Sequence, residues 1–182
     1  WPLLRRGWVR TCIDGSFWTL DANKGELTRF EFVSDRDSLL RAEAISFDKD
    51  SILRALDFVA FNDTTFLIPD YSGDSRFCWV NRQGKFLKKS GVIPSLNEEA
   101  LKEARPALAQ AWRSFIDYNP HNGVLVAATQ LGEVLEIYNL QNGFHRVCLG
   151  PKGEPEFKLA GGYAIPDGIM GFSDVQVTDE AI

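Results

Sequence analysis

The fold follows from the stretch SRFCWVN at residues 75–81, which is followed by Arg82, Gln83 and Gly84. It holds apolar residues that favour strands and ends at an Asn and a Gly, which form tight turns. The same pattern occurs at residues 16–21 with Gly25 and at 133–139 with Gly143, so the glycines are 59 residues apart. The sequence therefore predicts a repeated unit of strand, tight turn and strand.

Each of these units is preceded or followed by another strand pair of the same repeat. Residues 57–62 precede 65–68, residues 114–118 precede 124–128, and residues 173–177 precede 181–182. Outer strands are expected at residues 26–32, 86–90 and 144–149. Four antiparallel strands repeated at a long, even interval are typical of a β-propeller blade. The predicted fold class is all-β, a β-propeller with four-stranded antiparallel blades.

The whole chain, residues 1–182, is expected to be a single partial propeller domain of about three blades. The expected blades cover residues 8–33, 57–91, 114–150 and, incompletely, 173–182. Because the chain begins inside one blade and ends inside another, we expect it to be part of a longer propeller. The repeat exceeds the usual length of about 40–50 residues because of insertions at residues 34–56 and 95–113.

A short helical insertion is predicted near residues 95–113. Ser95 and Glu98 have the spacing of a capping box, and Pro106 should kink or split the helix. An apolar stripe at helical spacing indicates either packing on the propeller surface or a helix that binds a partner. Its members are Leu101, Ala104, Leu108, Ala111 and Trp112.

Composition excludes several classes of protein. The chain has 182 residues, of which 45% are hydrophobic and 25% charged, and this is a globular composition. A formal net charge of −5 repels a phosphate backbone, which disfavours nucleic acid as a partner. The sequence holds no run of eighteen apolar residues, so no transmembrane segment is predicted.

Three cysteines, Cys12, Cys78 and Cys148, are too widely spaced for the ligand pairs of a structural zinc site. We expect three buried strand thiols, with one disulfide or one reactive thiol as the alternatives.

Four segments of the chain resemble the TolB-like six-bladed β-propeller family of Bacteroides and relatives. They are Tyr118-Asn-Pro, residues 126–129, residues 131–138 and residues 171–179. The resemblance is strongest over residues 114–182 and looser over 8–92, and about half of the family's blades are absent. It implies export to the periplasm or the outer membrane, including attachment as a lipoprotein. The family offers no catalytic signature that can be transferred to residues of this chain.

Carboxylates form the most informative set of candidate site residues. Asp57, Asp117 and Asp174 fall near the start of three successive inner strands, 60 and 57 residues apart. Inner strands line a propeller channel, so these side chains are candidates for ligand binding and could hold a Ca²⁺-type cation through oxygen ligands. The alternative is that they bond backbone amides or face a watery channel. No other cofactor is predicted.

Other chemistry-bearing residues give weaker signals. His121 and His145 are the only imidazoles, and both are expected at the surface. The glycine clusters at residues 150–153 and 161–162 match no phosphate-binding loop and are interpreted as a connection between blades. Residues 70–74 resemble a calcium loop without its required spacing and are interpreted as an ordinary turn.

Three functions are consistent with these residues. The first is a non-enzymatic binding or scaffold propeller of the bacterial cell envelope, with a protein, peptide or glycan as its partner. The second is a metal-assisted hydrolase or lyase that uses an axial Ca-type cation. The third is a purely structural set of blades.

Overall fold

The computed structural model describes residues 7–11, 16–33 and 38–182. Almost all of the regular structure in these ranges is antiparallel β, arranged in three four-stranded sheets and one two-stranded sheet. The predicted all-β class with repeated four-stranded blades is confirmed. The chain separates into two compact units: residues 1–68 with 78–88 form unit 1, and residues 69–77 with 89–182 form unit 2.

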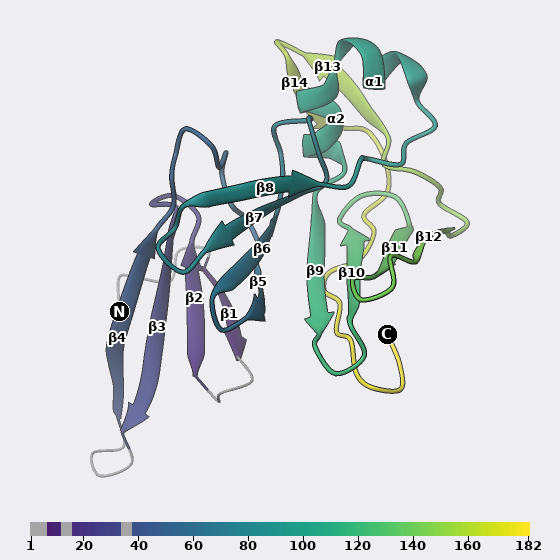
Figure 1. Cartoon of the computed structure of the whole chain (residues 1–182). Helices are drawn as coiled ribbons and strands as arrows, with labels where there is room; N and C mark the ends of the chain where they lie inside the picture. The colour runs from purple at the N-terminus through teal and green to yellow at the C-terminus, as the bar shows by residue number, and fades with distance from the viewer. Residues whose placement is uncertain (1–6, 12–15, 34–37) are drawn as a thin grey trace. The chain divides into compact units, whose positions relative to one another are not determined.

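The first sheet lies in unit 1 and has the strand order β1-β2-β3-β4 (Figure 1). Its strands are β1 (Gly7–Thr11), β2 (Phe17–Asp21), β3 (Glu26–Val33) and β4 (Ser38–Ser46). β4 was not expected, because residues 34–56 were interpreted as an insertion between blades. It pairs with the whole of β3, with an irregularity between Arg29 and Phe30. Strand pairing satisfies the N–H and C=O groups on the outer edge of β3.

The second sheet has the order β5-β6-β7-β8 and corresponds to the expected blade at residues 57–91. Its strands are β5 (Val59–Asn62), β6 (Thr65–Pro69), β7 (Phe77–Asn81) and β8 (Phe86–Ser90). Side chains of β6 and β7 are buried on both faces, whereas β8 is exposed. The core of unit 1 therefore joins the two sheets, with Phe66 in edge-on ring contact with Trp18 and Phe58.

The third sheet lies in unit 2 and has the order β12-β11-β10-β9. Its strands are β9 (Ser114–Asn119), β10 (Val124–Thr129), β11 (Val134–Asn139) and β12 (His145–Leu149). The hairpin turns contain Gly123 and Gly143, both at positive φ. Positive φ is the conformation that glycine adopts at little steric cost, which explains these turn residues. The four strands agree with the predicted meander.

The helical insertion forms two short helices, α1 (Glu98–Glu103) and α2 (Arg105–Ala111). The predicted break is confirmed, since Pro106 lies in the first turn of α2. The predicted capping box is wrong: Asn97 is the N-cap of α1, and its side chain accepts a hydrogen bond from the Ala100 N–H. Ser95 instead donates its hydroxyl to the Glu154 carboxylate at 2.7 Å.

The apolar stripe packs within unit 2. Leu108, Ala111 and Trp112 are buried together with Val134 of β11, and Phe157 and Ala164 pack against them. These last two residues belong to a hairpin of β13 (Phe157–Ala160) and β14 (Tyr163–Pro166). The sequence indicated only a connection there, with Gly161 and Gly162 inside it, and both glycines prove to form the hairpin turn. The stripe therefore serves packing within the propeller.

Residues 171–182 contain no strand in the structure, although one was expected at 173–177. Some of the N–H groups that strand pairing would need form other hydrogen bonds. The Val175 N–H donates to Asp174 Oδ1 and the Val177 N–H donates to Asp117 Oδ2. A strand forms only where backbone groups pair with a neighbouring strand. Here aspartate side chains accept these N–H hydrogen bonds instead of the backbone carbonyls of a neighbouring strand.

A buried ion pair holds unit 2 together. Arg76 donates from Nε to Glu136 at 2.8 Å and from Nη2 to Ser114 Oγ at 2.6 Å. The Arg76 and Glu136 side chains are 1% and 0% exposed. Tyr138 donates its hydroxyl to the other Glu136 oxygen at 2.6 Å. Burial, together with the neighbouring Glu136 carboxylate, raises the pKa of the Tyr138 hydroxyl far above its ordinary value.

Candidate functional site

The three aspartates singled out in the sequence each accept a backbone hydrogen bond. Asp57, in unit 1, is 1% exposed and accepts from the Phe58 N–H at 2.8 Å. Asp117, on β9, accepts from the Val177 N–H at 2.7 Å. Asp174 is exposed and accepts from the Val175 N–H at 2.9 Å. Two of the three therefore bond the N–H of the next residue.

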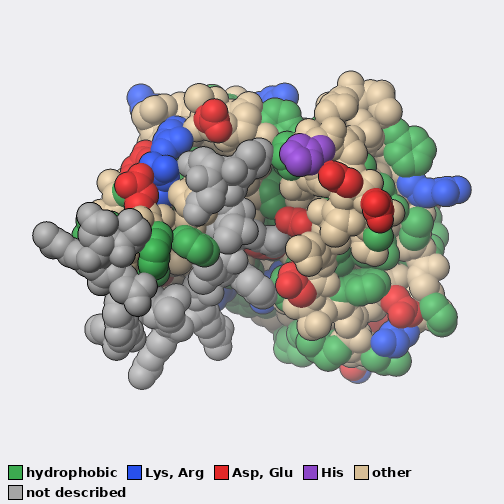
Figure 2. All heavy atoms as spheres, turned by 90° about the horizontal axis from the view of Figure 1, so that it is seen from below, with side chains coloured by type: hydrophobic (Ala, Val, Ile, Leu, Met, Phe, Trp, Pro, Cys, Tyr) green, Lys and Arg blue, Asp and Glu red, His purple; other side chains and the backbone are tan. Residues whose placement is uncertain are grey.

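Ca²⁺ takes six to eight oxygen ligands, so it needs several carboxylates close together. Within residues 7–11, 16–33 and 38–182, no three His, Cys, Asp or Glu side chains form such a group. Figure 2 shows acidic side chains interspersed with hydrophobic and other residues. The axial calcium site at Asp57, Asp117 and Asp174 stays a prediction.

Both histidines are exposed. His121 lies 3.3 Å from the Asp179 carboxylate, and the His145 ring stacks on Tyr138 with centroids 4.2 Å apart. Of the described cysteines, Cys78 on β7 is buried and Cys148 on β12 is exposed, and neither forms a disulfide. The expectation of a buried thiol is wrong for Cys148, because β12 is an outer strand with mostly exposed side chains. Cys12 lies outside the described residues.

The acidic side chains of the loop at residues 70–74 bind a lysine of the protein, Lys89. The Lys89 ammonium lies 3.0 Å from Asp70 Oδ2, 3.2 Å from Asp74 Oδ2 and 2.6 Å from the Ser72 hydroxyl. The hydrogen bond from Lys89, followed by its charge, lowers the pKa of the Asp74 carboxyl. These oxygens are the ones that a calcium-type loop would offer, and Lys89 neutralises them.

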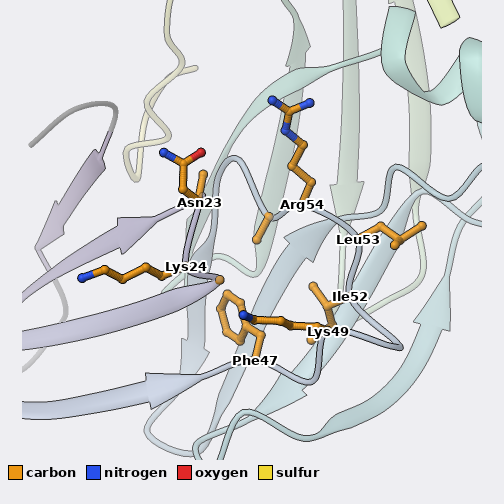
Figure 3. Close-up of a pocket in the computed structure, with 10 residues that line it drawn as sticks. Asn23, Lys24, Phe47, Lys49, Ile52, Leu53 and Arg54 are labelled. Carbon is orange, nitrogen blue, oxygen red and sulfur yellow. The ribbon is translucent and has the colours of Figure 1, made fainter.

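A pocket in unit 1 combines a repeat turn with the segment between β4 and β5 (Figure 3). Its volume is about 290 Å³. Figure 3 shows the Asn23 and Arg54 side chains extending in one direction, and the Lys49 side chain running past the ring of Phe47. The lining residues are Ala22, Asn23, Lys24, Gly25, Phe47, Lys49, Ile52, Leu53, Arg54 and Ala55.

Side-chain caps hold both loops of this pocket in place. Asp21 Oδ1 accepts from the N–H groups of Asn23 and Lys24, each at 3.0 Å. Asp48 accepts from the Asp50 N–H and from the Ser51 hydroxyl, and the hydroxyl is the main cause that lowers the pKa of the Asp48 carboxyl.

The two loops are joined to each other and to the next repeat. The Phe47 N–H donates to the Gly25 carbonyl at 2.8 Å, and the Asp48 N–H donates to the Gly84 carbonyl at 3.1 Å. Gly25 and Gly84 are equivalent turn residues of the repeat. The pocket is therefore formed by backbone that two repeat turns hold in position.

The electrostatics of the pocket are cationic. Among the described residues, its lining contains Lys24, Lys49 and Arg54 and no carboxylate, in a chain with a net charge of −5. Lys24 lies 3.8 Å from Asp21, whereas Lys49 and Arg54 have no hydrogen-bond or ion-pair partner within the part of the chain that the structure describes. Free cations above an apolar floor are able to bind an anionic ligand.

Arg54 also has an unusual backbone conformation. Its φ is +50°, and it is the one non-glycine residue at positive φ among those described. The left-handed region costs a residue with a side chain roughly 1–2 kcal/mol relative to glycine. Strained backbone of this kind occurs preferentially at binding and active sites.

The sequence did not single out this pocket. Residues 22–25 were identified as a repeat turn and residues 34–56 as a charged insertion, but their proximity depends on the pairing of β3 with β4. The unexpected strand β4 carries the chain back to the turn, so the pocket had no signal in the linear sequence.

The repeated four-stranded antiparallel sheets define this chain as part of a β-propeller protein. A model of the TolB-like 6-blade propeller-like family matches residues 9–182, so the chain belongs to that family. No curated protein matches the chain. Within the described residues, no helix has the length and hydropathy needed to cross a membrane.

Several solved structures resemble the chain at low identity. A candidate 6-phosphogluconolactonase from Bacteroides uniformis is 15% identical with a TM-score of 0.46, and the alignment covers 84% of this chain and 43% of that protein. Virginiamycin B lyase from Staphylococcus aureus is 12% identical with a TM-score of 0.47, covering 83% and 44%. Hydrazine synthase from Kuenenia stuttgartiensis is 12% identical with a TM-score of 0.46, covering 81% and 36%. The chain thus spans less than half the length of each.

Proposed function

We propose that this chain is a non-enzymatic binding module of the bacterial cell envelope. The observation that carries the proposal is the pocket of unit 1, which has donors and apolar contacts but lacks reactive groups. Within the part of the chain that the structure describes, the ten residues that line it include no carboxylate, His, Cys, Ser, Thr or Tyr. The two lysines are exposed, whereas a nucleophilic lysine requires a desolvated site. Such a lining holds a ligand without a general base or nucleophile to transform it.

The arrangement of the repeat supports recognition as well. Propellers place loops on a rigid framework of strands, and binding residues occur preferentially on such loops. Here the hydrogen bonds of Asp21 and Asp48 fix the loops before a ligand arrives, which lowers the entropic cost of binding. A protein, a peptide or a glycan of the envelope is the proposed partner class.

The binding function is tested by presenting the purified 182-residue chain to arrayed bacterial glycans and envelope peptides. We expect saturable binding of at least one class at micromolar to millimolar concentration. Fractionation of the source cells with an antibody against this chain should place it in the envelope fraction. Binding to no array member, or recovery of the chain outside the envelope, would contradict the proposal.

The competing function is metal-assisted hydrolysis or elimination. Calorimetric titration of Ca²⁺ into the chain, and into Asp117→Asn and Asp174→Asn variants, tests it directly. Heat that both substitutions abolish, combined with turnover of a lactone or ester substrate, would overturn the binding proposal. Absence of heat and turnover in the wild-type chain supports it.

A further inference from the structure

We propose that the pocket of unit 1 binds an organic anion that carries an apolar body. Lys49 or Arg54, whose side chains extend in different directions in Figure 3, would bind its oxyanion group, and Phe47, Ile52 and Leu53 would contact the body. This inference rests on the proposed binding function and specifies the chemical class of the ligand.

The charge of the pocket supports an anion. Lys49 and Arg54 are both exposed, and neither forms a hydrogen bond or ion pair with another residue within the described ranges. Guanidinium and ammonium groups form shorter and stronger hydrogen bonds with oxyanions than with neutral acceptors. Among the described residues that line the pocket there is no carboxylate, and the nearest acidic residues in the sequence are Asp48 and Asp50, which flank Lys49.

The floor of the pocket supports the apolar body. Phe47 and Ile52 belong to the hydrophobic core of unit 1, with 4% and 7% of their surface exposed. Leu53 is 52% exposed and lies beside them in the lining. A volume of about 290 Å³ lies at the lower end of ligand pockets, which span about 300–1,000 Å³, so one aromatic ring or a short alkyl chain fits.

The backbone at Arg54 supports a role for its side chain. A φ of +50° directs the chain through a region that glycine adopts at far lower cost, yet the residue is an arginine. Arg54 contributes no hydrogen bond or ion pair to the described fold that would compensate for this conformation. A contact between the Arg54 side chain and the ligand would explain why an arginine occupies this strained position.

Both a carboxylate and a phosphate monoester have the required oxyanion chemistry, and the experiment separates them. Benzoate and phenyl phosphate are titrated into the chain while amide chemical shifts are followed by NMR at low ionic strength. Benzyl alcohol tests the need for charge, and inorganic phosphate tests the need for the apolar body. We expect one or both organic anions to bind with a dissociation constant of roughly 0.1–1 mM, because exposed side chains must be ordered. Both control probes should bind at least tenfold more weakly.

Substitutions locate the site. At least one of the substitutions Lys49→Gln and Arg54→Asn should weaken binding about five- to twentyfold, and Asn tolerates the left-handed conformation of residue 54. The matched control is Lys102→Ala, which removes the same charge from an exposed helical position in unit 2 and should leave binding unchanged. Raising the salt concentration should weaken binding of the anions only.

Three outcomes would overturn the inference. Equal binding of benzyl alcohol and benzoate would show that the pocket does not select charge. Anion binding that Lys102→Ala weakens as much as Arg54→Asn would show nonspecific attraction. If arrayed glycans or peptides bind but Lys49→Gln and Arg54→Asn change nothing, the binding function stands and this ligand class fails. Turnover of an ester would instead overturn the binding function itself.

Discussion

Gly84 faces the carbonyl oxygen of Ser46 so closely that a Cβ atom at position 84 would collide with it. The equivalent turn glycines of the neighbouring repeats, Gly25 and Gly143, have nothing within 4 Å of that position. All three have positive φ, at +64°, +77° and +77° in chain order. Glycine is therefore favoured at all three positions by the backbone conformation. At position 84 it is also required because a side chain would not fit beside Ser46.

Alanine substitutions at these glycines separate the two requirements. Gly25→Ala and Gly143→Ala should each lower the free energy of unfolding by about 1–2 kcal/mol, the cost of the left-handed conformation. Gly84→Ala should lower it by roughly 3 kcal/mol or more, because the collision with Ser46 adds to that cost. Urea denaturation measures the three values. Equal losses at all three positions would contradict the close packing of Ser46 on Gly84.

The buried pair of Arg76 and Glu136 should be far more sensitive than any exposed ion pair. Arg76→Met should lower the free energy of unfolding by about 3–5 kcal/mol, because it leaves the Glu136 carboxylate buried without its cation. The double variant Arg76→Met/Glu136→Met should recover much of this loss, since it removes both charges.

A double-mutant cycle by chemical denaturation measures this coupling. The matched control is the exposed pair Lys102 and Glu98, for which Lys102→Ala should change stability by only about 0.5 kcal/mol. Additive effects of the two methionine substitutions would show that Arg76 and Glu136 do not stabilise each other.

Tyr138 should make the fold sensitive to alkali. Its pKa in the folded chain lies above the ordinary value of 10.0, so the unfolded chain loses the phenol proton first as the pH rises. The stability that this difference provides is complete below about pH 10 and declines above it. Tyr138→Phe should cost about 1.5–3 kcal/mol at pH 7, since the hydrogen bond to Glu136 is lost.

The stability difference between the wild type and Tyr138→Phe should therefore shrink as the pH rises above about 10. Urea denaturation at several pH values gives both curves. Tyr118, whose pKa burial also raises, is present in both proteins and cancels in the comparison. Parallel curves would show that Tyr138 does not cause the alkaline loss.

Arg54→Gly should stabilise the fold slightly while it removes a charge from the pocket. Relief of the left-handed conformation is worth about 1–2 kcal/mol, and the added freedom of the unfolded chain costs about 0.5–1 kcal/mol. Thermal denaturation should show a small net gain. Lys49→Gly, on the same loop without positive φ, should instead be destabilising. A loss of stability in Arg54→Gly equal to that of Lys49→Gly would show that Arg54 is not strained.

The hairpins of the repeat were predictable because each has its own local signal. An apolar strand, an Asp or Asn and a nearby Gly are adjacent in sequence, and the strands β7 and β11 begin and end close to the predicted residues. The strand β4 was not predictable, because it depends on pairing with β3 across a segment of charged residues. The N-cap at Asn97 was missed because Ser95, with the expected spacing to Glu98, instead bonds Glu154 in a distant part of the sequence.

The pocket was missed for the same reason as β4. Asn23 and Lys24 belong to a turn with a clear signal, while Lys49 and Arg54 belong to a segment with none. Asp57, Asp117 and Asp174 were easier to identify because they recur at the repeat interval. A pattern that recurs at the repeat interval identifies features that the blades have in common. This pocket depends on the segment between β4 and β5, which is not part of the repeat pattern.

The ion pair of Arg76 and Glu136 also bears on how such a repeat can evolve. Counted from the turn residues Asp21, Asn81 and Asn139, the counterparts of Arg76 are Ser16 and Val134, and those of Glu136 are Trp18 and Cys78. Recombination that exchanged one blade for another would place the arginine opposite a side chain without charge. The turns of the repeat are alike, but the blades are not interchangeable, because the Arg76–Glu136 pair joins two repeats whose corresponding positions elsewhere carry no charge.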